Sequence, residues 1–132
     1  MTNIWVIDDD PIFTFLTKTQ ITKRFDHILF ESFTNGAEAI DELKNVISSD
    51  KKCPDLILLD INMPLMDGWE FIEEYKALMG QLEQEVFILM VSSTIDIEEI
   101  ESVKDHKEVQ GFMSKPLIMD ELIRLIENDN LA

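Results

Sequence analysis

Two short apolar segments of this 132-residue chain run directly into aspartate. The segment IWVI (4–7) is followed by three consecutive aspartates, and LILL (56–59) is followed by one. Carboxylates avoid protein interiors unless they are paired or bind a metal, so acidic groups at the end of a buried segment call for a chemical reason. The aspartates at these points are Asp8, Asp9, Asp10 and Asp60.

Two further apolar segments end in groups that suit an anion. VFILMV (86–91) is followed by Ser92, and GFM (111–113) by Ser114 and Lys115. A hydroxyl donates a hydrogen bond and a lysine supplies a compact positive charge. Beside carboxylates that hold a divalent cation, these groups would suit a phosphoryl group, which an aspartate can accept as an acyl phosphate.

This chemistry requires the four segments to meet, and the pattern of elements predicts that they do. The apolar segments are mostly continuous, as expected for strands buried on both faces, and they alternate with amphipathic stretches. We expect an α/β protein with a flavodoxin-like (βα)5 fold, a parallel five-stranded sheet of order 2-1-3-4-5 and helices on both faces. The predicted strands are 4–7, 28–30, 56–59, 86–91 and 111–113, and the predicted helices are 11–25, 35–49, 67–79, 96–104 and 118–127.

Individual residues mark the predicted helices. Asp10 precedes Pro11 and Asp67 precedes Gly68, and both aspartates are expected to be helix N-caps. In the helix over 11–25 the apolar residues at helical spacing are Ile12, Phe13, Leu16, Ile21 and Phe25.

In that strand order the first and third strands are neighbours, roughly 4.8 Å apart. Asp60 is then expected beside Asp8 and Asp9. Three close carboxylates resist simultaneous ionisation, and Mg²⁺, which is usually held by one or two carboxylates and waters, would relieve the conflict. The sequence therefore predicts a Mg²⁺ site at the carboxyl edge of the sheet.

The charge composition argues against two classes of binding partner. The chain has 27 acidic and 11 basic residues and a formal net charge of −16, which disfavours binding to nucleic acid and to anionic membranes. Its longest apolar stretch has six residues, and its single cysteine, Cys53, excludes an intrachain disulfide. We expect a cytoplasmic protein.

Four motifs together resemble the receiver domain of two-component response regulators. They are VIDDDP (6–11), DLILLDINMPLMDG (55–68), MVSS (90–93) and GFMSKP (111–116). The resemblance covers nearly the whole chain. It implies a single receiver domain over residues 1–132, and because the chain ends soon after the last predicted helix we expect no output domain.

The resemblance also assigns roles. Asp60 matches the phosphoacceptor, Asp9 a direct Mg²⁺ ligand, Asp8 a ligand acting through water, and Asn62 a ligand through its backbone carbonyl. Ser92 and Lys115 match the groups that contact the phosphoryl oxygens, and the Lys115–Pro116 bond is usually cis in the family. Ser92 and Phe112 match the switch pair, in which the aromatic ring turns inward as the hydroxyl moves.

The function that follows is a signalling switch and not an enzyme, apart from slow self-dephosphorylation. The resemblance implies transfer of a phosphoryl group from a histidine of a sensor kinase or phosphotransfer protein to Asp60. The surface of the fourth helix, fifth strand and fifth helix would then change for an unidentified downstream protein.

Two alternatives remain open at this point. Asp8-Asp9-Asp10 also satisfies the D-x-D motif of haloacid-dehalogenase-type phosphohydrolases, with Asp8 as nucleophile and Asp10 as general acid. Alternatively, the chain is a receiver that is never phosphorylated and serves only as an interaction module.

Overall fold

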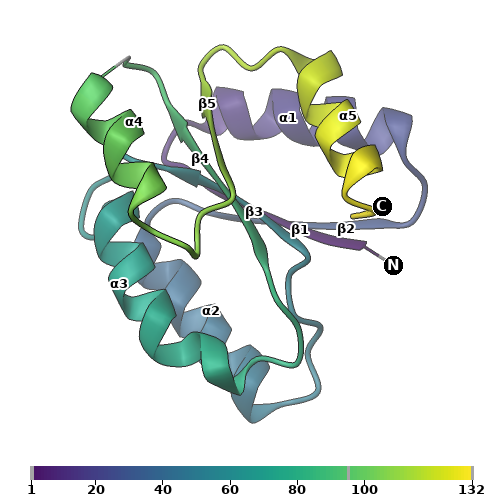
Figure 1. Ribbon diagram of the computed structural model, residues 1–132. Coiled ribbons are helices and arrows are strands. Elements are labelled where there is room, and N and C mark those ends of the chain that lie inside the picture. Colours follow the sequence, from purple (N-terminus) through teal and green to yellow (C-terminus); the bar gives the residue numbers. More distant parts are fainter. Residues whose placement is uncertain (1, 95, 132) are drawn as a thin grey trace.

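Five strands alternate with five α-helices along the chain in a computed structural model that describes residues 2–94 and 96–131 (Figure 1). A short 3₁₀ helix, η1, follows α3. The elements are β1 (Thr2–Ile7), α1 (Pro11–Arg24), β2 (Ile28–Phe33), α2 (Gly36–Ser48), β3 (Leu56–Asp60), α3 (Gly68–Leu78), η1 (Met79–Gln81), β4 (Phe87–Ser92), α4 (Ile97–Lys104), β5 (Gly111–Ser114) and α5 (Met119–Asn128).

The sheet has the order β2-β1-β3-β4-β5 and every pairing is parallel. Helices α1 and α5 cover one face, while α2, α3 and α4 lie on the other (Figure 1). The predicted flavodoxin-like fold and strand order are confirmed. The order changes direction between β1 and β3, and open α/β sheets bind ligands outside the strand ends at such a point.

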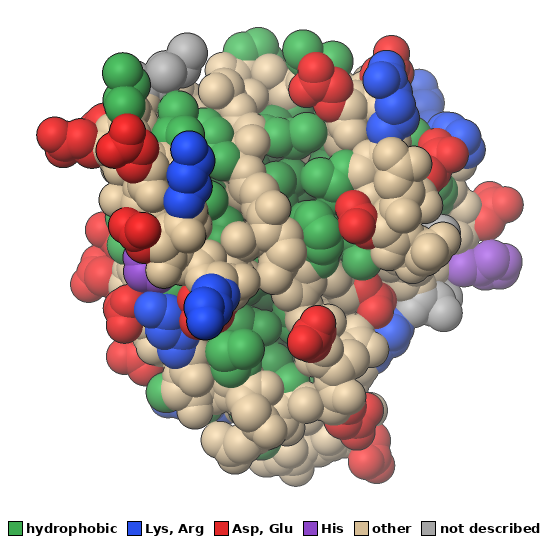
Figure 2. Space-filling model, in the orientation of Figure 1, with side chains coloured by type: hydrophobic (Ala, Val, Ile, Leu, Met, Phe, Trp, Pro, Cys, Tyr) green, Lys and Arg blue, Asp and Glu red, His purple; other side chains and the backbone are tan. Residues whose placement is uncertain are grey.

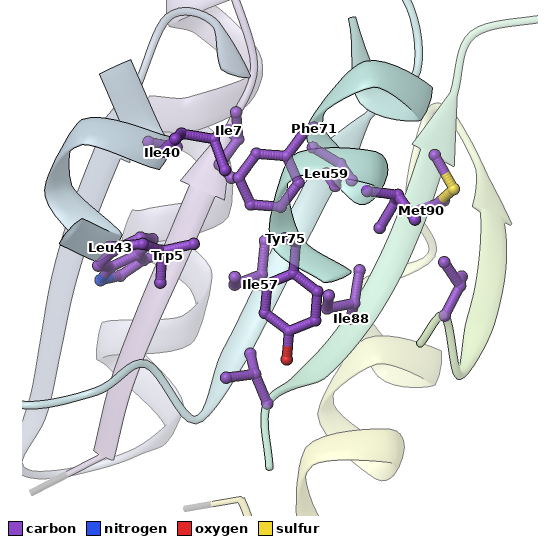
Figure 3. Close-up of a cluster of buried hydrophobic side chains, with 14 of the residues drawn as sticks. Trp5, Ile7, Ile40, Leu43, Ile57, Leu59, Phe71, Tyr75, Ile88 and Met90 are labelled. Carbon is purple, nitrogen blue, oxygen red and sulfur yellow. The ribbon is translucent and has the colours of Figure 1, made fainter. Parts of the chain in front are cut away.

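Alternation along the central strands divides the core into two layers. In β1, Trp5 and Ile7 belong to the cluster under α2 and α3, whereas Ile4 and Val6 belong to the cluster under α1 and α5. Figure 3 shows the first cluster, in which Phe71 of α3 packs over the sheet. Side chains of a strand point alternately to opposite faces, so apolar residues at every position mean that both faces are buried.

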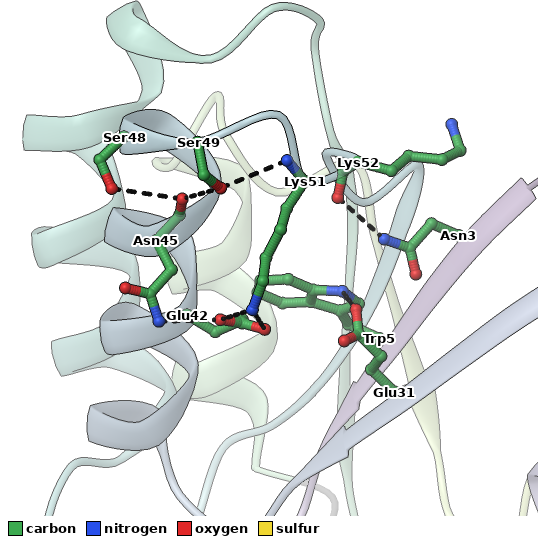
Figure 4. A network of polar contacts seen from close by, with 9 residues as sticks. All are labelled: Asn3, Trp5, Glu31, Glu42, Asn45, Ser48, Ser49, Lys51 and Lys52. Carbon is green, nitrogen blue, oxygen red and sulfur yellow. Dashed lines mark hydrogen bonds and ion pairs between the residues drawn. The ribbon is translucent and has the colours of Figure 1, made fainter.

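The edge strand β2 departs from the predicted range 28–30 by extending to Phe33. Glu31 interrupts the apolar run, and the sequence alone gives no reason to continue a strand through it. In the structure Glu31 lies opposite Trp5 and accepts a 2.8 Å hydrogen bond from the indole nitrogen (Figure 4). A buried tryptophan N–H needs such an acceptor, so the acidic residue completes the pairing.

The predicted helix caps are confirmed. Asp10 accepts hydrogen bonds from the backbone nitrogens of Ile12 and Phe13, at 3.0 and 3.3 Å. Asp67 forms a capping box with Glu70, in which each side chain binds the other's backbone nitrogen.

The apolar face expected for α1 is partly wrong. Ile12 and Leu16 are 69% and 52% exposed, and the buried residues of the helix are Thr17 and Ile21. Since α1 covers the sheet beside its edge strand, only a narrow stripe of the helix is buried, and helical spacing alone could not tell which apolar residues lie in it.

Gly68 fixes the start of α3 against the end of β3. Its backbone nitrogen donates to the Ile61 carbonyl at 2.9 Å, and an added Cβ would lie 2.6 Å from the Asp60 carbonyl oxygen. Because that oxygen belongs to the backbone, it can move only if the strand end moves. The close approach therefore requires glycine and ties the loop after Asp60 to the helix.

We predict that Gly68→Ala lowers the unfolding free energy by about 1–3 kcal/mol, the usual cost of overpacking. Urea denaturation checks this value. Gly80→Ala is the matched control, because nothing lies within 4 Å of a Cβ there, and it should be neutral or slightly stabilising. Equal stability of the two variants would contradict the steric argument.

Candidate functional site

The ends of β1 and β3 bring the aspartates together as predicted. Ile7 pairs with Leu59 in the sheet, so the residues that follow them emerge side by side. One carboxylate oxygen from each of Asp8, Asp9 and Asp60 lies within 4.8 Å of the other two. Asp8 and Asp60 are buried, whereas Asp9 is exposed.

Lys115 reaches this group from the loop after β5. Its ammonium lies 2.6 Å from Asp8 Oδ2 and 3.9 Å from Asp60 Oδ2. Its backbone nitrogen donates to the Ser92 carbonyl at 2.8 Å, and the Lys115–Pro116 bond is cis, as the sequence resemblance predicts. One positive charge therefore faces two buried carboxylates.

The excess of negative over positive charge affects the pKa values of the two buried aspartates. Burial, together with the smaller effect of the neighbouring Asp8 charge, raises the pKa of Asp60 to about 6 against the lowering effect of Lys115. Burial also raises the pKa of Asp8, against the opposing effect of its contact with Lys115. The ionised forms of both carboxyl groups are therefore destabilised, and a bound cation would stabilise them.

The donor set fits a hard divalent cation. All three groups offer carboxylate oxygens, which Mg²⁺ prefers, and they converge from two neighbouring strand ends. Asn62 follows closely, and its backbone nitrogen donates to Asp60 Oδ1 at 3.4 Å. That contact places the loop after β3 at the site, where the sequence predicts a carbonyl ligand from Asn62.

Ser92 ends β4, one position beyond the residue that pairs with Asp60. Its side chain is buried, and its hydroxyl oxygen lies 3.2 Å from both the hydroxyl and the backbone nitrogen of Thr94. Phe112 is partly buried and packs against the core cluster under α2 and α3. The switch roles predicted for Ser92 and Phe112 remain predictions.

The third aspartate of the run has a different place. Both contacts of the Asp10 side chain go to the first turn of α1, and its own backbone nitrogen donates to Asp8 Oδ1 at 2.9 Å. Asp10 is a helix cap rather than the general acid that the phosphohydrolase alternative requires.

Comparison with known proteins decides the family. Residues 4–127 match the response regulator receiver domain. The chain is a response regulator receiver domain. Membership makes it a phosphoacceptor of two-component signalling rather than a catalytic enzyme, and it implies a histidine kinase as partner.

Relatives of known sequence agree with this assignment. The receiver is 28% identical over 125 residues to the DNA-binding transcriptional regulator NtrC of Escherichia coli, matching 94% of this chain but 24% of the relative. It is 27% identical over 123 residues to the chemotaxis protein CheY of Bacillus subtilis, covering 93% of this chain and 92% of that protein. The chain thus spans about a quarter of the length of the NtrC relatives.

Solved structures match the whole fold. A two-component response regulator from Cytophaga hutchinsonii aligns with a TM-score of 0.84 and 29% identity, covering 97% of this receiver and 96% of that chain. A response regulator receiver protein from Dyadobacter fermentans aligns with a TM-score of 0.80 and 28% identity, covering 97% of both chains.

The receiver's surface reflects its acidic composition. Acidic side chains are spread around the face seen in Figure 2, with a few lysines and arginines among them. Among the described residues, none of the helices combines the length and apolar character needed to cross a membrane.

Two residues of the site have roles that the sequence did not reveal. Thr94 has no part in the predicted site, yet its hydroxyl and backbone nitrogen both lie 3.2 Å from the Ser92 hydroxyl oxygen. Phe13 was expected only as an apolar helix residue, but its ring lies under the Lys115 ammonium. The Ser92–Thr94 contact spans two residues and is of a kind that serine hydroxyls often form in turns. No spacing rule relates α1 to the loop after β5, so the contact of Phe13 with Lys115 has no local signal.

The raised pKa of Asp60 predicts how stability depends on pH. Between about pH 4 and pH 6 the folded protein binds more protons than the unfolded chain, so without divalent cations stability should fall as pH rises through this window. The contribution of Asp60 to this loss should reach roughly 3 kcal/mol at most, from about two pKa units. Urea denaturation at pH 4.5 and 7.5 in a chelating buffer measures it.

Asp60→Asn should remove the part of this dependence that comes from Asp60 and be more stable than the parent at pH 7.5, while Asp8, whose pKa is also raised, should leave a weaker dependence of the same sign. Asp41→Asn, an exposed substitution on α2, should keep the parental pH dependence. A parental slope in Asp60→Asn would show that the site does not raise the pKa of that carboxyl.

Proposed function

We propose that Asp60 of this receiver accepts a phosphoryl group from a histidine of its partner. The observation that favours Asp60 over Asp8 as the acceptor is that the two buried carboxylates differ in how closely their oxygens are bound. Asp8 has both oxygens engaged, one by Lys115 at 2.6 Å and one by the Asp10 backbone nitrogen at 2.9 Å. Asp60 has only longer contacts, at 3.9 Å to Lys115 and 3.4 Å to Asn62, so its oxygens are freer to attack.

The transfer balances simply. An Asp60 oxygen attacks phosphorus as the bond to the imidazole nitrogen breaks, and that nitrogen keeps the bonding electron pair. The product is an acyl phosphate on Asp60. The Lys115 ammonium is then close enough to pair with a phosphoryl oxygen, and Ser92 supplies a hydroxyl from the next strand end.

Asp8, Asp9, Asp60 and the backbone carbonyl of Asn62 would hold Mg²⁺. When bound, this ion neutralises the phosphoryl oxygens and the carboxylates that face them. The support is the donor set itself, three carboxylates within 4.8 Å, together with the raised pKa of both buried acids.

The Ser92 hydroxyl is suited to act as the switch. In the unmodified protein it contacts Thr94, which stands two positions before Asp96, the N-cap of α4. If Ser92 turns to the phosphoryl group, it gives up Thr94, and the loop before α4 loses that contact. Phe112 would move inward as this happens, changing the surface of α4, β5 and α5.

Exposed apolar side chains near the site suit a protein donor. Ile12, Phe15 and Leu16 lie on α1, and Leu65 and Ile118 lie in the loops after β3 and β5, all more than half exposed. We propose that a sensor histidine kinase or histidine phosphotransfer protein docks here, because exposed apolar residues on the segments that follow Asp10, Asp60 and Lys115 suit a protein partner.

Acetyl phosphate with Mg²⁺ should add one phosphoryl group to the protein, detected by intact mass spectrometry. Asp60→Asn should remain unlabelled, because an amide oxygen is a poor nucleophile, whereas Asp41→Asn should label like the parent. Equal labelling of Asp60→Asn would refute the assignment. Steady release of phosphate from phosphate esters would instead revive the phosphohydrolase alternative.

Mg²⁺ should stabilise the receiver by relieving repulsion among the carboxylates. At about a hundred times its dissociation constant it should add about 2.7 kcal/mol to the unfolding free energy. Asp9→Asn should weaken this effect while raising stability in chelator, because it removes a charge beside two buried acids. Urea denaturation with and without Mg²⁺ at constant ionic strength checks both, and identical Mg²⁺ responses would contradict the metal site.

A further inference from the structure

We propose that Phe13 is a positioning residue that holds the Lys115 ammonium at the mouth of the site during phosphoryl acceptance. This inference rests on the proposed role of Asp60. The residue that acts on the phosphoryl group is Lys115, and Phe13 acts through it.

Three groups surround the ammonium. It lies 2.6 Å from Asp8 Oδ2, 3.9 Å from Asp60 Oδ2 and 4.4 Å from the centroid of the Phe13 ring. The Lys115 side chain is only 15% exposed, so little water competes for it. A cation within about 6 Å of an aromatic face is attracted by the ring quadrupole, and the attraction grows when the cation is desolvated.

The ring is placed by the third aspartate of the run. Asp10 accepts a hydrogen bond from the Phe13 backbone nitrogen at 3.3 Å, which fixes Phe13 in the first turn of α1. The side chain then packs against the core cluster under α1 and α5. Asp8 and Asp10 therefore hold Lys115 from two directions, one by direct pairing and the other by capping the helix that carries the ring.

An aromatic ring suits this position better than another carboxylate. A carboxylate would take one of the ammonium's three N–H donors and would repel an incoming phosphoryl group. The ring attracts the cation without accepting a directed hydrogen bond, so the donors stay free. Lys115 can then exchange Asp8 for a phosphoryl oxygen without leaving the ring.

Other cation–ring contacts in the described residues lack these features. Arg24 lies 5.3 Å from the Phe25 centroid, and Lys18 lies 5.9 Å from that of Phe30. Both cations are on exposed positions of α1, away from any ion pair with the buried acids. Phe25, the C-cap residue of α1, therefore serves as a matched control.

The first test is the kinetics of labelling by acetyl phosphate in Mg²⁺. Phe13→Leu keeps an apolar side chain but removes the ring, and it should lower the maximal labelling rate constant about fivefold, within the range of a partly buried cation–π contact. Phe13→Tyr should restore the parental rate, and Phe25→Leu should not change it. The Mg²⁺ concentration for half-maximal labelling should stay within about twofold of the parental value, because the ring contacts Lys115 and not the carboxylates that would bind Mg²⁺.

The second test does not depend on phosphorylation. The ε-methylene protons of Lys115 should be shifted upfield by the ring current in the parent and in Phe13→Tyr, but not in Phe13→Leu. In a double-mutant cycle with Lys115→Met, the effect of Phe13→Leu on the unfolding equilibrium should shrink by about threefold or more, since the ammonium is already gone. A purely structural ring would show no such coupling.

Parental labelling by Phe13→Leu, or a Phe13→Leu effect that is unchanged in the Lys115→Met background, would overturn the inference. If Phe13→Leu does not fold, Phe13→Met takes its place in both tests. A parent protein that takes up no phosphoryl group would overturn the proposed function instead, and the shift and the cycle would still decide whether Phe13 holds Lys115.

Discussion

Two buried carboxylates and one ammonium form the interaction on which the rest of this structure depends. Asp8 and Asp60 lie at adjacent strand ends, and Lys115 reaches both while pairing closely with only one. Asp9 adds a further negative charge within 4.8 Å. The folded chain therefore keeps an excess of negative charge at a place from which water is largely removed, and this excess creates the demand for a cation.

The fold maintains that arrangement by tying loops to strand ends. Gly68 binds α3 to the end of β3 through a contact too close for any side chain, and the Lys115 backbone is bonded to the end of β4. At the other end of the sheet, Asn3 and Asp55 link β1 to the segment before β3, with Asn3 also binding the Lys52 carbonyl (Figure 4). Strands β1 and β3 are thus fastened at both ends, which fixes the spacing of the acids between them.

Much of this could be predicted from the sequence, because parallel strands buried on both faces leave continuous apolar runs. Those runs located β1, β3 and β4 to within two residues at their starts and one at their ends, and the residues after them met at one edge as topology requires. The exposed part of α1 could not be predicted, since Ile12 and Leu16 fit a helical stripe yet lie outside it. The extension of β2 through Glu31 could not be predicted either, because the reason for an acidic residue there is its hydrogen bond to Trp5 on the neighbouring strand. The contact of Phe13 with Lys115 joins segments whose relative placement depends on the packed fold, so no local pattern could have shown it. The contact of Ser92 with Thr94 spans only two residues and is of a kind that serine hydroxyls often form in turns.

The two tryptophans lie in different surroundings. Trp5 is fully buried beside Phe33, with a ring-centroid distance of 4.8 Å, and its indole nitrogen is bound to Glu31. Trp69 directly follows Gly68, and its ring lies 5.2 Å from that of His106 beyond the end of α4. The intrinsic fluorescence of this protein therefore combines a steady emitter inside the sheet with a second emitter between α3 and the turn that follows α4. Replacing Trp5 alone would leave the fluorescence of Trp69, which lies beside α4, the helix whose surroundings are expected to change on phosphorylation.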